Sequence, residues 1–221
     1  MKPETLRAAD CDTIVLAAGL SSRMPGGKLL RITEGRPLIR IAVGHALEAS
    51  RRAIVVVGHE ADAVIAALGE APSHRLVVVR NPHYRDGMLG SIQAGMRSVT
   101  SAWFFIVPGD MPLLVRGVYN HIAAAAPHID DAASVDGDDH VAPPRAVVPY
   151  YRNTRGHPVL IHRSLIPALL SQPRDAGPMR DLLSRCPVRR VDLDEPAITV
   201  DLDTEDAFRR YRDQRAGPPP R

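Results

Sequence analysis

Four short runs of consecutive apolar residues alternate with stretches of helical periodicity between residues 12 and 126, and this alternation strongly constrains the fold. The runs occupy residues 13–17, 53–57, 76–79 and 103–107. Continuous apolar runs are typical of strands covered on both faces, and helices between such strands indicate parallel βαβ units. Helical patterns occupy residues 37–47, where Pro37 can open the first turn, and residues 61–68 and 91–99. The sequence therefore predicts a doubly wound α/β fold, a mostly parallel sheet flanked by helices, with ligands beyond the carboxyl ends of the strands.

The second half of the chain departs from this pattern. Residues 126–145 contain three prolines and five aspartates and predict a long loop. After it we expect a hairpin of residues 146–150 and 158–161, helices near 164–170 and 178–185, short strands at 188–191 and 197–200, and a last helix at 204–212. Residues 217–221 predict a disordered, proline-rich tail after a single domain over residues 1–216.

Composition argues against several classes of function. The 28 basic and 25 acidic residues are scattered and leave a net charge of +3, which gives little support to a nucleic-acid partner. No apolar run approaches the roughly 18 residues of a membrane span, and nothing at the start resembles a signal peptide, so we expect a cytoplasmic protein. Cys11 and Cys186 lack the spacing of a disulfide framework or a zinc site and are interpreted as reduced structural thiols.

The loop over residues 16–28, directly after the first apolar run, combines small residues, hydroxyls and the cations Arg23 and Lys28. Such a loop presents backbone amides and positive charge to a polyphosphate. Lys28 stands out because the chain has 26 arginines and only one other lysine. The loop is not a P-loop, since Leu29 stands where Ser or Thr would bind magnesium, and the chain has no GxGxxG motif. The alternative is an ordinary glycine-rich turn between a strand and a helix.

Two acidic positions are candidate metal ligands. Asp110 follows the apolar run at 103–107, where the active site of an open α/β sheet lies, although a turn-forming aspartate is the alternative. Asp201 and Asp203 share one side of an extended segment before the last helix, although an acid or threonine there is also the usual helix cap. One of these acids can cap the helix while the other coordinates a cation.

Two further segments follow predicted strands. Residues 81–92 contain Gly87 and Gly90, which let the backbone approach a flat ligand, and Ser91, which we expect to start a helix whose amides face the site. Their turn dipeptides are also routine in loops. Residues 155–158, with Gly156 and His157, are candidates to close over a second substrate, although a lone histidine beside proline is more often structural.

Five segments, taken in order, resemble the molybdenum cofactor cytidylyltransferase family within the MobA-like NTP transferases. They are residues 16–28, 81–92, 109–112, 156–160 and 201–204. The similarity spans about residues 13–208, and five spaced elements are more specific than any one of them. The chain departs from the family pattern at Pro25-Gly26, where the family has a single glycine, and at Glu205-Asp206-Ala207, where the family usually has Pro-Glu-Asp.

The resemblance implies a Rossmann-like nucleotidyltransferase fold, with a nucleotide-binding half at about residues 12–126 and an acceptor-binding half at about 145–212. It also implies the role of each site residue: Leu16, Ala17, Ala18 and Gly19 on the base and ribose, Ser91 and Gly95 near the base, Arg23 and Lys28 on the triphosphate, and Asp110 and Asp203 on Mg²⁺. Family members with alanine at the position of Ala18 tend to use CTP, so Ala18 favours CTP.

These parts predict a magnesium-dependent transfer of CMP from CTP to the terminal phosphate of molybdopterin or molybdenum cofactor, with release of pyrophosphate. Arg23, Lys28 and Asp110 are the expected catalytic residues, and Gly156 and His157 the expected acceptor contacts. One alternative is the same fold acting with GTP or on a sugar phosphate. Another is a binding protein that delivers the cofactor without turnover, docking through residues 130–139. Delivery can coexist with catalysis, because an air-sensitive product is better passed to a molybdoenzyme than released.

Overall fold

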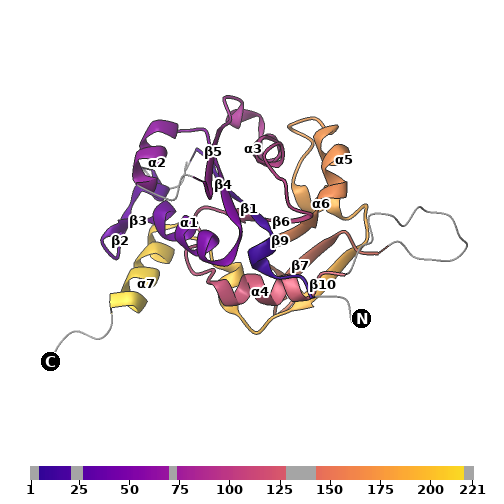
Figure 1. The fold of residues 1–221 in the computed structure, drawn as a ribbon. Coiled ribbons are helices and arrows are strands. Elements are labelled where there is room, and N and C mark those ends of the chain that lie inside the picture. The colour runs from indigo at the N-terminus through magenta and orange to yellow at the C-terminus, as the bar shows by residue number, and fades with distance from the viewer. Residues whose placement is uncertain (1–4, 21–26, 70–73, 128–142, 217–221) are drawn as a thin grey trace, which may run out of the picture.

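A mixed sheet with helices on both faces forms the body of the protein (Figure 1). The computed structural model describes residues 5–20, 27–69, 74–127 and 143–216, with side chains up to Asp213. The large sheet contains β1 (Asp12–Ala17), β4 (Arg52–Val57), β5 (Leu76–Arg80), β6 (Trp103–Pro108), β7 (Ala146–Tyr151), β8 (Thr154–Arg155), β9 (Val159–His162) and β10 (Val188–Asp192). A small hairpin pairs β2 (Ile32–Thr33) with β3 (Arg36–Pro37).

The α-helices are α1 (Leu38–Ala49), α2 (Ala61–Leu68), α3 (Met88–Met96), α4 (Arg116–Ala124), α5 (Ile166–Leu170), α6 (Met179–Leu183) and α7 (Glu205–Ala216). Short 3₁₀ helices are η1 (Ala8–Asp10), η2 (Lys28–Leu30), η3 (Tyr84–Asp86), η4 (Arg163–Leu165) and η5 (Pro196–Thr199). No helix in the described ranges has both the length and the apolar character that a membrane span requires.

The order of the strands reverses at one point of the sheet. It runs β10-β7-β9-β6-β1-β4-β5, with β8 attached to β7. Strands β6, β1, β4 and β5 are parallel, whereas β9 runs antiparallel to both β6 and β7. Because the chain proceeds from β1 toward β5 and then returns to place β6 on the other side of β1, the strand order reverses between β1 and β6. Ligands of open α/β sheets bind at such a reversal.

Alternating residues of the central strands fill two separate cores. Val15, Val55 and Phe105 face one side of the sheet and pack with α1, α2 and α4. Ile14 and Ile54 face the other side and pack with α3, α5 and α6. This is the period-two alternation of a strand covered on both faces. The predicted doubly wound fold is therefore confirmed.

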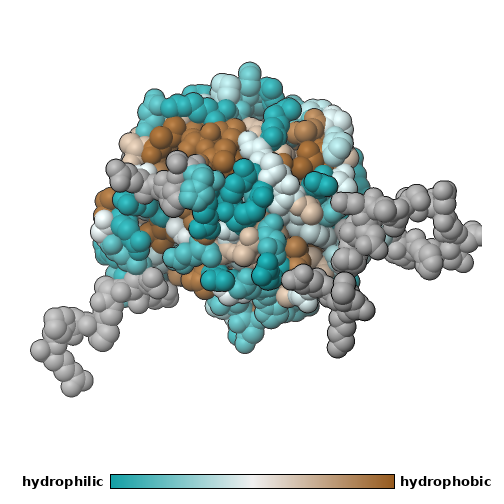
Figure 2. Space-filling view, viewed as in Figure 1, coloured by the Kyte–Doolittle hydropathy of each residue, from teal (hydrophilic) through white to brown (hydrophobic). Residues whose placement is uncertain are grey.

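The sheet ends at β5 on one side, and apolar surface lies over α2 and beside this strand (Figure 2). Within β5, Val78 is exposed, in contrast to the buried residues of β4. Both cysteines are free thiols, and Cys11 is fully buried, where burial first and then the nearby acids raise its pKa to about 12. This agrees with the structural role expected for Cys11.

Three local predictions are wrong in detail. Residues 197–200 do not form a strand, because Pro196 opens the 3₁₀ helix η5 and the side chain of Glu195 accepts a hydrogen bond from Ala197 N at 3.2 Å. Helix α3 begins at Met88, so Ser91 lies one turn inside it. The predicted hairpin pairs β7 with β9, but its tight turn joins β7 to β8.

The C-terminal helix α7 docks against elements from the first forty residues, as Figure 1 shows beside β2 and β3. Leu202, Phe208 and Tyr211 form a small core with Leu38. Tyr211 Oη donates to Glu34 Oε1 at 3.1 Å, and Arg31 pairs with Glu205. The N-terminus of α7 is capped by Thr204, whose hydroxyl accepts from Ala207 N at 3.2 Å. This docking brings the segment before α7 to the carboxyl edge of the sheet.

Candidate active site

Lys28, Asp110 and Asp203 meet at the carboxyl edge of the sheet, although they lie far apart in the sequence. Lys28 follows β1 at the start of η2, Asp110 follows β6, and Asp203 precedes α7. The Lys28 ammonium donates to Asp110 Oδ2 and to Asp203 Oδ1. Because β1 and β6 are neighbours, with Leu16 opposite Pro108, the residues after both strands fall beside the reversal of strand order.

The backbone holds the two acids in this place. Gly109 N donates to Leu16 O at 2.9 Å, which fastens the turn after β6 to the end of β1. Leu202 N donates to the carbonyl of Asp110 at 3.1 Å, which fastens the segment before α7 to the same turn. The two carboxylates are therefore positioned by main-chain hydrogen bonds as well as by their shared contact with Lys28.

Burial dominates the electrostatics of this group. Asp110 is only 7% exposed, and burial raises the pKa of its carboxyl, with the charge of Asp203 adding to the rise and that of Lys28 opposing it. Burial alone would lower the pKa of the Lys28 ammonium, but Asp110 and Asp203 outweigh it and hold this pKa above its ordinary value. Lys28 is therefore a cation at neutral pH.

The two acids fit a divalent cation. Asp110 Oδ1 is buried and has no hydrogen-bond partner among the described residues. Carboxylate oxygens are the ligands that Mg²⁺ and Mn²⁺ prefer, and Mg²⁺ is commonly held by one or two carboxylates together with substrate phosphates and water. No group of three acidic, histidine or cysteine ligands is present within the described residues. The protein would thus supply two ligands, and a phosphorylated substrate and water would supply the others.

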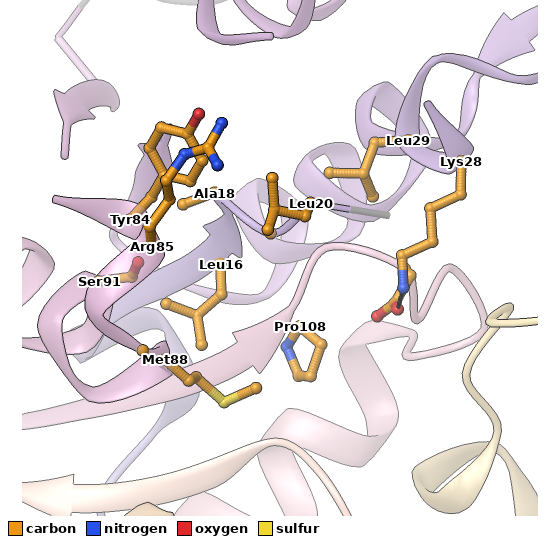
Figure 3. A pocket seen from close by; sticks show the side chains of 13 residues that line it. Leu16, Ala18, Leu20, Lys28, Leu29, Tyr84, Arg85, Met88, Ser91 and Pro108 are labelled. Carbon is orange, nitrogen blue, oxygen red and sulfur yellow. Dashed lines mark hydrogen bonds and ion pairs between the residues drawn. The ribbon is translucent and has the colours of Figure 1, made fainter. Parts of the chain in front are cut away.

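A first cavity of about 320 Å³ opens beside Lys28 and Asp110. Figure 3 shows Lys28 on one side of it and Tyr84 and Arg85 on the other, with Leu16 and Pro108 between them. The cavity thus combines an apolar floor with cations from two different loops.

Some of the residues that the resemblance assigns to the nucleotide line the first cavity, and others do not. Leu16, Ala18, Gly19 and Ser91 line the first cavity. Ala17 points to the opposite face of the sheet and packs in the core under α1. Arg23 lies outside the described residues, as do most residues of the long acidic loop expected at 126–145.

Gly95 is a packing residue in this structure and does not line the cavity. A Cβ atom at this position would lie 2.8 Å from Ile14 Cγ2 and 2.9 Å from Val56 Cγ2. Glycine is therefore required where α3 crosses β1 and β4 at close range. Ser91 is held by the neighbouring loop, because its hydroxyl accepts from Asn81 Nδ2 at 3.0 Å.

A second cavity of about 290 Å³ adjoins the first, and Leu16, Met88 and Pro108 line both. His157 lines the second cavity. Burial lowers the pKa of His157, so the imidazole is neutral at pH 7, and its Nδ1 is buried without a partner among the described residues. Gly156 does not line this cavity. It packs closely against Ile198, because a Cβ atom at this position would lie 2.6 Å from the carbonyl oxygen of Ile198.

Asp203, and not Asp201, is the C-terminal acid that meets Asp110. Asp201 is exposed, whereas Leu202 between the two acids is fully buried and turns Asp203 toward Lys28. Thr204 caps α7 by accepting from Ala207 N. Of the two roles considered for this segment, the helix cap thus falls to Thr204, and Asp203 is the candidate cation ligand.

Sequence reasoning gave no individual role to Tyr84 and Arg85 in segment 81–92 or to Arg155 in segment 155–158, and it missed Arg180 entirely; all four line the cavities. Arg85 follows β5 in η3, and its guanidinium lies 5.5 Å from the ring centroid of Tyr84. Their position after a predicted strand is a usable signal. Composition offers no signal for Arg85 or Arg180, because the chain has 26 arginines and no single arginine stands out among them.

Comparison with known proteins identifies the family of this chain. Residues 13–191 match the model of the MobA-like NTP transferase domain. The chain is 27% identical to the molybdenum cofactor cytidylyltransferase of Escherichia coli K12, over 92% of this chain and 95% of that protein.

Solved structures with the same fold include a nucleotidyl transferase from Methanothermobacter, with a TM-score of 0.72 and 23% identity over 92% of this chain and 96% of that one. A Mycobacterium tuberculosis H37Rv protein, solved in complex with manganese, has a TM-score of 0.67 and 23% identity over 92% of this chain and 98% of that one. The family match covers most of the chain, including Lys28 and Asp110. The chain therefore belongs to the MobA-like NTP transferase family and has the fold of a nucleotidyltransferase.

Proposed function

We propose that this protein transfers CMP from CTP to the terminal phosphate of molybdopterin or molybdenum cofactor and releases pyrophosphate. The observation that carries the proposal is the meeting of Asp110, Asp203 and Lys28 beside the first of two adjoining cavities. Two cavities suit a reaction that joins two substrates, and the cytidylyltransferase of Escherichia coli supports the choice of CTP and of this acceptor.

The reaction needs positioning and charge more than it needs a general base. The acceptor phosphate is already an anion at neutral pH. One of its oxygens forms a bond to the α-phosphorus of CTP while the bond from that phosphorus to the bridging oxygen breaks, and pyrophosphate leaves with the electron pair. Lys28 would place its positive charge on the phosphates of the bound nucleotide. We assign a similar role to Arg23, in the part of the loop outside the described residues.

Asp110 and Asp203 are the residues that would hold Mg²⁺. When bound, the cation supplies positive charge that offsets the negative charge of the reacting phosphates. The buried Oδ1 of Asp110, which has no partner in the described part of the chain, supports this assignment, as does the manganese complex of the Mycobacterium tuberculosis protein. Lining of the first cavity by Leu16, Ala18, Gly19 and Ser91 supports the nucleotide site.

A turnover assay tests the proposal. The purified full chain is incubated with Mg²⁺, molybdopterin and either CTP or GTP, and pyrophosphate and the dinucleotide product are measured. We expect release of pyrophosphate only when molybdopterin and CTP are both present. Turnover with GTP in place of CTP, or with a sugar phosphate in place of molybdopterin, would contradict the assignment.

Replacement of the acids tests the site itself. D110N and D203N should each lower the turnover rate by about 10²- to 10³-fold, because charge stabilisation of the reacting phosphates is lost. D201N is the matched control, since Asp201 is an exposed acid two residues from Asp203, and it should keep the wild-type rate. Circular dichroism would show that the folds are intact, and an active D110N enzyme would exclude the proposed site.

A further inference from the structure

We propose that the second cavity binds the body of the acceptor, and that Arg155 and Arg180 bind an anionic group of the acceptor other than the phosphate that receives CMP. This inference rests on the proposed function and specifies the chemical class of acceptor. It assigns two arginines from the C-terminal half of the chain to substrate recognition.

The walls of the second cavity are largely apolar. Ile92 and Ile106 contribute from α3 and β6, and Val159 and Ile161 contribute from β9. Such walls suit the faces of a flat ring system, because burial of apolar surface is favourable while unpaired hydroxyl groups are costly to bury. The polar side chains that line the cavity belong to Arg155, His157 and Arg180, which is few for a hydroxyl-rich sugar.

Arg155 is a cation whose charge is poorly compensated by protein. It lies in β8, where its backbone pairs with Tyr150. The charges that act on its guanidinium come from Tyr150, Arg180 and Asp181. Burial is the main cause that lowers the pKa of its guanidinium, and the charge of Arg180 acts in the same direction, while Tyr150 and Asp181 oppose them. A partly buried guanidinium beside a second cation gains from an anionic ligand, since charge-assisted hydrogen bonds are among the stronger ones in proteins.

Arg180 lines the same cavity and belongs to α6, whereas Arg155 belongs to β8. Its ion pair with the adjacent Asp181 is 3.4 Å long, and both side chains are more than 60% exposed. An exposed pair of this kind contributes little and leaves the guanidinium available to a ligand. Arg155 and Arg180 thus form a two-cation site in a cavity whose other lining residues, His157 apart, are apolar.

The geometry separates this site from the reacting phosphate. Asp110 and Lys28 line the first cavity, Arg155 and Arg180 line the second, and the shared residues Leu16, Met88 and Pro108 lie between them. An acceptor that spans both cavities can place its phosphate in the first cavity and a second anionic group in the second. In molybdopterin that second anion is the dithiolate, which lies on the ring that also carries the phosphate arm.

The experiment compares two acceptors and four proteins. The acceptors are molybdopterin and its derivative with both sulfurs alkylated by iodoacetamide, which keeps the ring and phosphate but has no thiolate charge. The proteins are the wild type, R155M, R180M and the control R185M, in which an exposed arginine just beyond α6 is replaced. Equilibrium binding of each acceptor is measured by dialysis, and turnover with CTP is measured separately.

We expect R155M and R180M to bind molybdopterin at least about tenfold more weakly than the wild type, with an unchanged KM for CTP. They should bind the alkylated derivative about as well as the wild type does, because the anion they recognise is gone. R185M should match the wild type with both acceptors. The inference is overturned if R155M and R180M retain full affinity for molybdopterin, or if they lose equal affinity for both acceptors.

These outcomes separate the inference from the proposed function. Absence of CTP-dependent turnover in the wild type counts against the proposed function, whatever the binding data show. Turnover in the wild type with no effect of R155M and R180M on affinity leaves the proposed function standing and removes the two arginines from it.

Discussion

At the residue scale, the Lys28 ammonium and a divalent cation require the same two carboxylates. Lys28 donates to both Asp110 and Asp203, which are also the residues that would hold the metal. Opposite charges at such short range in a buried site interact strongly, so the ammonium and the metal compete unless the ammonium moves. The phosphates of a bound nucleotide offer Lys28 another anionic partner. Metal and nucleotide should therefore bind more tightly together than separately.

Substitution of Lys28 by methionine should have opposite effects on metal binding and on catalysis. K28M removes the competing charge, so Mn²⁺ should bind about tenfold more tightly in the absence of nucleotide, as measured by electron paramagnetic resonance. The same variant should lower the rate of pyrophosphate release by about 10²-fold or more, because a cation that meets the phosphates is lost.

Lysine usage in this chain makes the control unusually clean. K2M replaces the only other lysine and should change neither property. Selective ¹⁵N labelling of lysine also gives just two side-chain signals, of which the Lys28 signal should shift when Mg²⁺ and CTP are added together. Mn²⁺ affinity that is unchanged or weaker in K28M would show that Lys28 does not compete for the carboxylates.

At the element scale, a buried acid ties together the strand ends opposite the active site. The Asp12 carboxylate, fully buried at the start of β1, accepts from Arg52 at 3.0 and 3.1 Å and from the backbone of Thr100 at 2.8 Å. Burial would raise its pKa, but these partners outweigh burial and lower the pKa to about 2 from its ordinary 3.8. Asp12 thus joins β1, β4 and the loop before β6.

The sign of this shift fixes a pH dependence of stability. A carboxyl whose folded pKa lies below its unfolded value contributes stability above pH 3.8 and loses it as the pH falls toward 2. The lowered pKa corresponds to about 2 kcal/mol. D12N should lower the free energy of unfolding at pH 7 by about 2 to 4 kcal/mol, because it leaves Arg52 without its buried partner. Urea unfolding of wild type and variant between pH 2 and 7 measures both effects.

Asp10 provides the comparison for Asp12. Its ion pair with Arg7 is exposed, so D10N should change stability by less than about 1 kcal/mol. If D12N proves no more destabilising than D10N, the network around Asp12 does not stabilise the fold as described.

The elements that sequence predicted well are those whose residues carry a strong pattern. Strands β1, β4, β5 and β6 are continuous apolar runs, and α2 begins and ends as predicted. The structure departs where one local contact decides the conformation, as at η5, where the Glu195 side chain caps a turn that begins with Pro196. The expectation that Ala17 contacts the nucleotide together with Leu16 and Ala18 ignored the alternation of a strand. Alternate residues of a strand face opposite sides of the sheet, so Ala17 faces away from the cavity.

The candidate site was predictable only in part. Lys28 and Asp110 follow strands that must be neighbours in a doubly wound sheet, so their proximity follows from the fold. The choice of Asp203 over Asp201 depends on which way Leu202 is buried, which requires the docking of α7. Arg180 lies in a five-residue helix, and its position beside residues of β6 and β9 depends on tertiary packing that the sequence pattern does not reveal. Gly95 has a packing role that depends on how closely α3 crosses β1 and β4.

At the scale of the whole molecule, the site joins both ends of the chain. Asp203 reaches Lys28 because α7 packs on Leu38 at the start of α1 and on the β2–β3 hairpin, an arrangement visible in Figure 1. The core beneath α7 is small and separate from the two main cores. A small satellite core at a chain end is a region where local opening costs less free energy than global unfolding.

Loss of a single side chain in this small core should therefore open the C-terminal segment without unfolding the sheet. F208A removes a ring that is only 5% exposed and that lies under the guanidinium of Arg31 at 4.3 Å, and burial of such a ring stabilises its surroundings by about 3 to 5 kcal/mol. Amide hydrogen exchange should become faster over residues 200–213 while β1 and β4 stay protected, and R209A, an exposed neighbour, should change neither region.

The consequence for the active site distinguishes this arrangement from a helix that only stabilises the fold. With α7 loosened, Asp203 no longer stays beside Asp110, so F208A should bind Mn²⁺ in the presence of CTP about as weakly as D203N does. A helix that contributes stability alone would leave Mn²⁺ affinity unchanged at temperatures where F208A is folded. Faster exchange that extends equally through β1 and β4 would instead place α7 in one cooperative unit with the sheet, and Asp203 would then be held by the entire fold.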